Sequence, residues 1–377
     1  MKVVVAPDSF KACLSSREVG LAISQGIHDA CPDADVRCVS VADGGEGTVD
    51  TVISALGGKM CSARVSDPLG RSVEAVYGIA GDTAVLEMAS ASGLPLLAPE
   101  ERNPLLTSTY GTGELIRNAL AAGCRRFLIG IGGSATNDGG TGMLEALGWR
   151  FYDAAGQLVH GCGAALEQIV RVDDTEVLPA LREARFTVAC DVDTPFYGPA
   201  GAAFVFAPQK GASPEMVRRL DAGLRAFASV VKTATGVSLD ESVAGAGAAG
   251  GLGGAFLAFL GATLLRGVDM VLDAVGFDSL LDGADYVVTG EGRMDGQTAR
   301  GKLSAGVLER AKKRGLPVFA LCGAVIDRSS LEKMGFSRMI AVSDGIPLEV
   351  AMREEVAKER LRICASELFR RERKNEK

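Results

Sequence analysis

The sequence predicts an α/β protein built from two α/β domains, one with a parallel sheet of the Rossmann or flavodoxin type and one with a mixed sheet. The first observation is length, because 377 residues exceed the roughly 250–300 at which a single hydrophobic core usually stops growing. The second is that strand-like and helix-like runs alternate near both ends of the chain, which is typical of a parallel sheet covered by helices. The third is that the middle of the chain lacks this alternation. We therefore expect residues 65–282 to be inserted into a discontinuous terminal domain formed by residues 1–64 and 283–377.

Hydrophobic periodicity and turn residues place the elements of the terminal domain. An apolar run over 2–6 predicts the first buried strand, and an amphipathic pattern over 16–30 predicts the first helix. Further strands are expected over 35–41, 286–289, 317–322 and 338–342, and further helices over 48–55, 304–314 and 348–370.

The middle of the chain shows shorter strand-like runs separated by turns. Runs over 63–65, 73–79 and 84–88 indicate an antiparallel or mixed sheet, and buried runs over 125–129 and 186–190 predict two more strands. The stretch 242–265 has no charged residue and is long enough to cross a bilayer. Its first half is almost entirely Gly and Ala, so we interpret it as a glycine-rich loop followed by a buried helix from about Leu252.

Charge and cysteine usage exclude several function classes. A net charge of −7 disfavours a nucleic-acid-binding surface. The nine cysteines form no C-x-x-C pair, which is typical of reduced intracellular thiols and not of a disulfide framework or a zinc site. With two histidines, a serine–histidine hydrolase or a histidine-rich metal centre is poorly supported. No signal peptide precedes the first strand, so we expect a cytoplasmic protein without a membrane partner, and a homo-oligomer is compatible with the sequence.

The stretch that dominates the sequence is 130–142 (GIGGSATNDGGTG), between a predicted strand and a predicted helix start. Glycine lets the backbone approach a ligand, and free N–H groups beside a helix N-terminus attract anions. The alternative is a turn that only connects two elements, but so many glycines are costly in chain entropy for a connector. We therefore expect a phosphate-handling loop, with contacts from Gly132, Gly133, Ser134, Thr136 and Asn137.

Two nucleotide-binding fingerprints are present but incomplete. Gly130-x-Gly132-x-x-Ala135 follows a strand, as in the dinucleotide fingerprint, yet the acidic residue expected further on, Asp153, lies in what looks like a hairpin turn. A Walker-like stretch ends at Lys302, but Leu303 stands where the pattern requires Ser or Thr. Neither fingerprint stands by itself.

Acidic residues follow most of the predicted strands. Such carboxylates can hold Mg²⁺ or accept a proton from a substrate hydroxyl, although a single one is more often a helix cap or a turn residue. Together with the glycine loops they favour a polyphosphate–metal site, and nearby cations can balance phosphate charge. The carboxylates are Asp8, Asp43, Glu46, Asp138, Asp191, Asp193, Glu291 and Asp295, and the cations are Lys11, Lys210, Arg293 and Lys302.

Several motifs resemble those of type-1 glycerate kinases, in order and over essentially the whole chain. They are APDSFK (6–11), VADGGEGT (41–48), GIGGSATNDGG (130–140), ACDV (189–192), PQKGA (208–212), GAGAAGG (245–251), TGEGR (289–293) and GK (301–302). The resemblance implies two α/β domains and ATP-dependent phosphorylation of D-glycerate, generally at the 2-hydroxyl, with ATP and Mg²⁺ as cofactors. Phosphorylation at the 3-hydroxyl, an NAD-dependent hydroxy-acid dehydrogenase and a non-catalytic metabolite sensor are the alternatives.

The residues and the resemblance together suggest roles for individual side chains. Asp191 is the predicted base, because it is the first polar residue after the strand 186–190; the alternative is a cap of the turn before Pro195. Lys11 and Lys302 are the other predicted catalytic residues, and the predicted metal ligands are Asp43, Glu46 and Glu291. The predicted substrate and phosphate contacts are Asp8, Ser9, Gly44, Gly45, Gly132, Gly133, Ser134, Thr136, Asn137, Lys210, Gly290 and Arg293.

Overall fold

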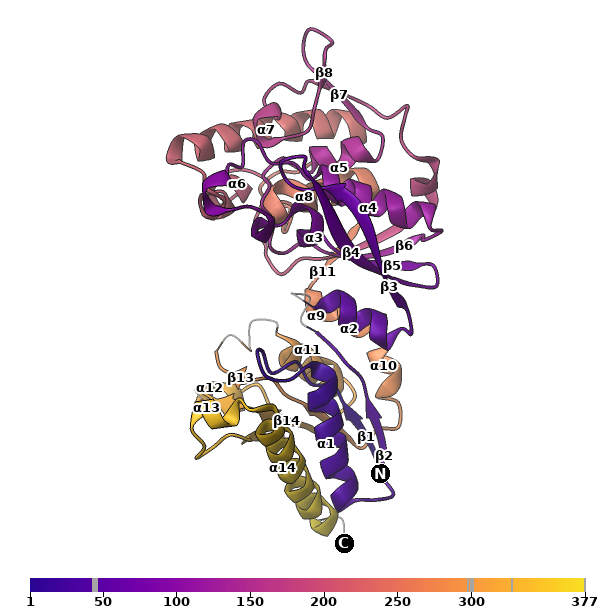
Figure 1. Ribbon diagram of the computed structural model, residues 1–377, viewed down its shortest axis with the longest axis vertical. Coiled ribbons are helices and arrows are strands. Elements are labelled where there is room, and N and C mark those ends of the chain that lie inside the picture. Colours follow the sequence, from indigo (N-terminus) through magenta and orange to yellow (C-terminus); the bar gives the residue numbers. More distant parts are fainter. Residues whose placement is uncertain (43–46, 297, 299–301, 327, 376–377) are drawn as a thin grey trace. The chain divides into compact units, whose positions relative to one another are not determined.

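The computed structural model describes residues 1–42, 47–296, 298, 302–326 and 328–375 (Figure 1). The chain divides into two compact units. The terminal unit comprises Met1–Leu56 and Val268–Lys377, and the central unit comprises Gly57–Gly267. Within the residues described, no helix combines the length and apolar character that crossing a membrane requires.

The terminal unit is built on a five-stranded sheet in which every pair of neighbouring strands is parallel. Its order is β16-β14-β12-β1-β2. Numbered within the unit, the first strand lies between the second and the third, which is the flavodoxin-type order. The sequence prediction of a parallel sheet of this type is therefore confirmed. The strands are β1 (Lys2–Val5), β2 (Asp35–Cys38), β12 (Tyr286–Thr289), β14 (Val318–Cys322) and β16 (Arg338–Ala341).

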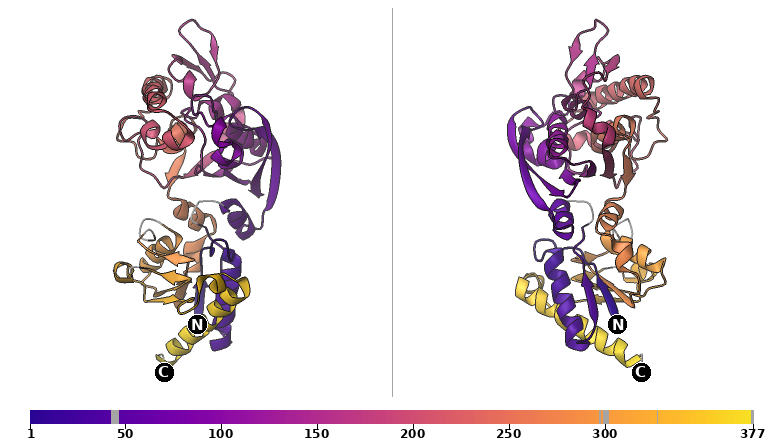
Figure 2. Two further views of the ribbon diagram at one scale, coloured as in Figure 1. Left: turned by 60° about the vertical axis from the view of Figure 1, so that its left-hand side comes forward. Right: turned by 90° about the vertical axis from the view of Figure 1, so that its right-hand side faces the viewer.

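Helices from the two ends of the chain pack against each other in this unit. α1 (Ser16–Ala30) and α14 (Glu354–Asn375) lie side by side (Figures 1 and 2). Their close approach requires glycine at position 26, because a Cβ there would lie 2.2 Å from the carbonyl oxygen of Arg362. Other helices of the unit are α2 (Thr48–Ala55), α10 (Phe277–Leu280), α11 (Leu303–Lys312), α12 (Arg328–Glu332) and α13 (Leu348–Ala351), and a short parallel pair joins β13 (Arg293–Met294) to β15 (Ala324–Val325).

The central unit contains a six-stranded mixed sheet, as predicted. Its order is β11-β10-β6-β5-β4-β3; β5, β6, β10 and β11 are parallel, whereas β3 and β4 are antiparallel to their neighbours. The strands are β3 (Lys59–Ser66), β4 (Ser72–Ala80), β5 (Thr83–Glu87), β6 (Arg126–Gly130), β10 (Arg185–Ala189) and β11 (Thr263–Leu265). A separate three-stranded sheet contains β7 (Arg150–Tyr152), β8 (Leu158–Val159) and β9 (Arg171–Asp173).

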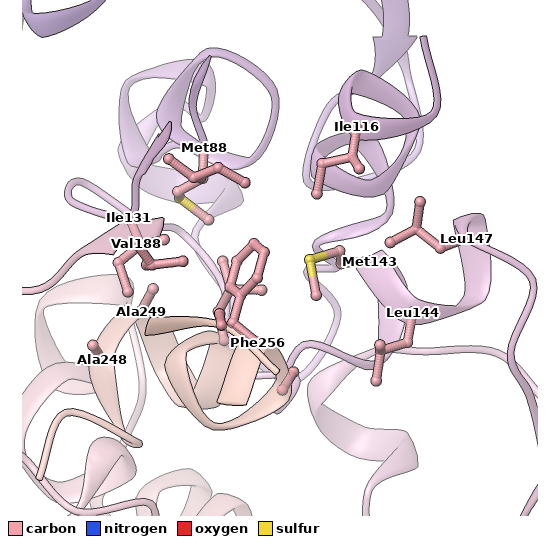
Figure 3. Close-up of a cluster of buried hydrophobic side chains, with 14 of the residues drawn as sticks. Met88, Ile116, Ile131, Met143, Leu144, Leu147, Val188, Ala248, Ala249 and Phe256 are labelled. Carbon is pink, nitrogen blue, oxygen red and sulfur yellow. The ribbon is translucent and has the colours of Figure 1, made fainter. Parts of the chain in front are cut away.

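The core of the central unit forms between the six-stranded sheet and its helices. Figure 3 shows the side chains of Met88, Met143 and Phe256 facing a common centre, and all three are fully buried. The α-helices and 3-10 turns are α3 (Ala89–Ser92), η1 (Leu94–Leu96), η2 (Pro99–Glu101), α4 (Tyr110–Ala121), α5 (Thr141–Ala146), η3 (Gly163–Ala165), η4 (Pro179–Glu183), α6 (Ala202–Phe206), η5 (Pro208–Lys210), α7 (Pro214–Thr235) and α8 (Ala248–Leu260), and α9 (Gly267–Ala274) begins at the boundary between the units.

The unit boundaries differ from the expected 64/65 and 282/283. β3 pairs with β4 along its whole length, so the chain enters the central unit before β3. After residue 267 the chain returns to the terminal unit, because Arg310 of α11 binds the carboxylates of Asp269, Asp273 and Asp278. Whether each unit folds independently as a domain stays a prediction.

Two further expectations concern helices. The uncharged stretch does contain a left-handed turn at Ala249, Gly250 and Gly251 followed by regular helix from Leu252, as predicted. The single helix expected over 348–370 is wrong, since the structure has α13 and then a separate α14. Glu354 and Glu355 occupy the first turn of α14, where negative charge stabilises a helix N-terminus.

Candidate functional site

The carboxyl edge of the terminal sheet brings two sequence-predicted loops together. Parallel sheets of this order bind ligands at the switch point between their first and third strands, here β1 and β12. Asp8, in the loop after β1, donates its N–H to the carbonyl oxygen of Gly290 at 2.8 Å, in the loop after β12. Position 290 requires glycine, because a Cβ there would lie 1.9 Å from the carbonyl oxygen of Leu321. The two loops are thus held in close backbone contact.

A cavity of about 320 Å³ opens at this switch point. We call it the switch-point cavity. Six of the residues predicted from sequence line it, namely Asp8, Ser9, Lys11, Glu291, Arg293 and Lys302. It is also lined by Phe10, Cys13, Gly292, Gly323, Ala324, Ser343, Leu348, Ala351 and Met352.

Two side chains hold the carboxylate of Glu291 in the cavity. Its Oε2 lies 3.1 Å from Nζ of Lys302, and its Oε1 accepts a hydrogen bond from Oγ1 of Thr298 at 3.1 Å. Burial raises the pKa of Glu291, and the neighbouring Lys302 opposes that rise. The carboxylate of Glu291 thus fixes the position of the Lys302 ammonium group in the cavity.

Lys11 lies on a tight turn beside the same cavity. Backbone hydrogen bonds in both directions between Phe10 and Leu14 close the turn. Ala12 within it has φ of +60°, a left-handed conformation that costs a non-glycine residue on the order of 1–3 kcal/mol. The side chain of Lys11 is exposed and forms no ion pair with any residue in the described part of the chain. An anionic ligand in the cavity can therefore reach its exposed ammonium group.

Sequence reasoning missed the part of the cavity contributed by the last two strands. Gly323 follows β14 and Ser343 follows β16, and the strand-end rule that located Asp8 could have found both. Leu348, Ala351 and Met352 gave no such signal, because they were expected to belong to a long charged helix.

The glycine-rich stretch belongs to the central unit and is mostly buried. Gly132 and Gly133 are exposed, whereas residues 134–142 are buried. Register pairs Gly130 with Glu87 and with Ala189, so the exposed glycines lie at the carboxyl edge of the parallel strands. This edge is a second candidate site.

Asp138 connects the buried part of this stretch to α4 and α5 by hydrogen bonds. Its carboxylate is fully buried and accepts hydrogen bonds from the N–H and hydroxyl of Thr109 and from the N–H groups of Gly140 and Gly142, at 2.7–3.2 Å. Burial raises the pKa of Asp138, and these hydrogen bonds oppose the rise. The backbone N–H groups of Gly140 and Gly142, at the start of α5 (Thr141–Ala146), are therefore hydrogen-bonded within the protein.

Lys210 has an internal role in the same region. The residue is 2% exposed, and its ammonium group donates to Oγ of Ser134 at 2.7 Å and to the carbonyl oxygen of Thr136 at 2.6 Å. Burial lowers the pKa of Lys210 to about 7, and the charge of Asp138 opposes that fall. Oγ1 of Thr136 and both polar side-chain atoms of Asn137 are buried without a hydrogen-bond partner among the described residues. The phosphate contacts predicted for these residues stay predictions.

Asp191 follows β10 at the carboxyl edge of the central sheet and is exposed. Its Oδ1 accepts the N–H of Gly267, the first residue of α9, at 2.9 Å. The side chain therefore caps a helix, which is a different partner from the turn considered in the sequence. Its role as a base stays a prediction.

Four predicted residues, Asp43, Gly44, Gly45 and Glu46, lie outside the described residues. Two of the three predicted metal ligands are among them. Within the described ranges, no three His, Cys, Asp or Glu side chains are grouped so that they could hold a metal ion.

The fold is that of an α/β protein with a cavity lined by charged side chains at the carboxyl edge of a parallel sheet. The model of the glycerate kinase family matches residues 3–372. A Bacillus subtilis (strain 168) protein named glycerate kinase is 47% identical over 355 residues, covering 93% of each chain. An Escherichia coli (strain K12) protein named glycerate 2-kinase is 47% identical and covers 87% of this chain and 86% of its own. A crystal structure assigned as glycerate kinase 2, from Salmonella typhimurium LT2, superposes with a TM-score of 0.91 at 42% identity and covers 100% of this chain and 99% of its own. The chain belongs to the glycerate kinase family and is an enzyme of this class.

Proposed function

We propose that the chain transfers the γ-phosphoryl group of ATP to the 2-hydroxyl of D-glycerate, giving 2-phosphoglycerate and ADP. The observation that carries the proposal is the switch-point cavity, where the sequence-predicted carboxylates and cations converge. Family membership supports the substrate, and the names of two relatives, glycerate 2-kinase and glycerate kinase 2, favour the 2-hydroxyl over the 3-hydroxyl.

Phosphoryl transfer requires positioning and charge compensation more than covalent chemistry. Lys11 and Lys302 supply positive charge in the cavity, and Glu291 holds the Lys302 ammonium in place. The carboxylates of Asp8 and Glu291 are hard oxygen donors lining one cavity, which is the ligand type that Mg²⁺ prefers. We expect them to hold Mg²⁺, which when bound neutralises charge on the phosphate oxygens.

The nicotinamide-dependent alternative loses its acidic anchor. Asp153 lies in the turn between β7 and β8, where its Oδ1 accepts the N–H groups of Ala155 and Gln157. That carboxylate therefore stabilises a hairpin turn, whereas the dinucleotide fingerprint requires an acidic residue that binds a ribose hydroxyl.

The test is an incubation of the purified chain with D-glycerate and MgATP, followed by chromatographic measurement of ADP and phosphoglycerate. We expect ADP and phosphoglycerate in equal amounts and no turnover in excess EDTA. We also expect no change in the nicotinamide absorbance band when NAD replaces ATP. Oxidation of D-glycerate by NAD without ATP consumption would contradict the proposal, and so would the absence of both reactions. We further expect the enzyme to act in the cytoplasm, where ATP is available, which cell fractionation can check.

A further inference from the structure

We propose that the switch-point cavity is the nucleotide site, with the phosphate groups at its charged residues and the base against an apolar wall made of Phe10, Leu348, Ala351 and Met352. The inference rests on the proposed function, because it says which part of the chain binds ATP. It goes beyond the proposed function by naming the residues that contact the base.

The part of the wall formed by Leu348, Ala351 and Met352 lies in the same cavity as the charged residues but at a different strand end, whereas Phe10 adjoins Lys11 after β1. The charged residues follow β1 and β12, whereas α13 follows β16, which is separated from β12 by β14. Neighbouring strands lie about 4.8 Å apart, so these two strand ends are about 10 Å apart across the sheet. The base and the terminal phosphates of an extended nucleotide are separated on this scale.

Backbone hydrogen bonds connect the two parts. Gly323 donates its N–H to the carbonyl oxygen of Glu291 at 3.1 Å, and Ser343 donates to the carbonyl oxygen of Gly323 at 3.2 Å. The loops after β12, β14 and β16 therefore form a continuous floor under the cavity. A ligand on this floor can contact the charged residues and α13 together.

The apolar wall identifies the occupant. Leu348 is 73% exposed and Met352 is 40% exposed, and side chains four residues apart lie on one face of a helical segment. D-glycerate carries an oxygen on each of its three carbons, so it offers no apolar surface to this wall. The base of a nucleotide has a flat face that an apolar wall can cover. The cavity volume also lies in the range of roughly 300–1,000 Å³ typical of sites for ligands much larger than a three-carbon acid.

The test separates contact with the base from contact with the phosphates. Leu348→Ser removes the most exposed part of the wall, and Leu106→Ser is the matched control, because Leu106 is a 60% exposed leucine of the central unit. Calorimetric titration of each folded variant with ADP and with inorganic tripolyphosphate, each in the presence of Mg²⁺, gives two dissociation constants. We expect Leu348→Ser to raise the Kd for ADP about fivefold or more. Its Kd for tripolyphosphate should stay within about twofold of wild type, and Leu106→Ser should change neither constant.

The outcomes are distinct. An unchanged Kd for ADP in Leu348→Ser would overturn the inference, as would a loss of D-glycerate affinity with ADP binding intact. If the wild type makes no phosphoglycerate but Leu348→Ser weakens ADP alone, the nucleotide site stands and the proposed function fails. If the wild type is a glycerate kinase and ADP binding is indifferent to Leu348→Ser, the inference alone fails.

Discussion

Two glycines of the stretch 130–142 should respond differently to the same substitution. A Cβ at Gly132 would meet no atom within 4 Å, and its φ is not positive. Alanine there restricts the unfolded chain without straining the native one, so Gly132→Ala should leave the free energy of unfolding unchanged or raise it by about 0.4–1 kcal/mol.

Gly139, unlike Gly132, has a left-handed backbone conformation and close neighbours. Its φ is +61°, and a Cβ there would lie 3.2 Å from Cδ2 of Leu166 and from Cδ1 of Phe227. The left-handed conformation costs alanine about 1–2 kcal/mol, and the crowded contacts add to it. Gly139→Ala should therefore lower the free energy of unfolding by about 2–3 kcal/mol.

Urea unfolding and steady-state kinetics on the same preparations separate the two roles. If the exposed part of the loop faces a ligand, Gly132→Ala should lower kcat/KM about tenfold or more with undiminished stability. Normal kinetics in Gly132→Ala would show that this edge is only a connector. Wild-type stability in Gly139→Ala would refute the argument that this glycine is required by packing inside the unit.

Three other substitutions test the buried charges and the predicted base. Asp138→Asn places an amide N–H₂ among four donors, so the free energy of unfolding should fall by about 3 kcal/mol; an unchanged urea midpoint would contradict this. The pKa of Lys210 is about 7 in the folded protein, below its ordinary value of 10.5. Between pH 7 and pH 10.5 the unfolded state therefore binds more protons than the folded state, so Lys210 makes the free energy of unfolding rise with pH over this range. Lys210→Met should flatten that rise in thermal melts taken across this range, and an identical pH slope would argue against a buried titrating lysine. Asp191→Asn keeps an oxygen that can accept the Gly267 N–H, so stability should change by less than about 1 kcal/mol, whereas loss of a base should lower kcat by roughly 10²–10⁴-fold; a fall of less than tenfold would leave Asp191 as a helix cap alone.

The sequence was most informative where a local pattern determines the structure. Alternating strand and helix runs predicted the parallel sheet, and six of the site residues predicted from sequence are among those that line the switch-point cavity. The same patterns could not place the boundary between the units. That boundary depends on pairing between β3 and β4 and on the contacts of Arg310, which no local pattern encodes.

The glycine-rich stretch shows a different limit. Composition correctly indicates a loop with unusual backbone geometry, but it does not say whether the missing side chains make room for a ligand or for the protein. The absence of a side chain at Gly139 leaves space for Leu166 and Phe227, and the carboxylate of Asp138 accepts hydrogen bonds from the N–H groups of Gly140 and Gly142. Leu348 and Met352 could not be placed for a related reason, since the break between α13 and α14 depends on how the chain turns after β16.

The most direct test of the account is to identify the hydroxyl that receives phosphate. Wild-type protein is incubated with D-glycerate and MgATP, and the product is observed by proton-coupled ³¹P NMR. Carbon 2 of glycerate carries one hydrogen and carbon 3 carries two, so phosphate on the 2-hydroxyl gives a doublet and phosphate on the 3-hydroxyl gives a triplet. We predict a doublet that grows in step with ADP. A triplet would contradict the proposed regiochemistry, and the absence of any phosphoglycerate signal while the protein remains folded would contradict the proposed function itself.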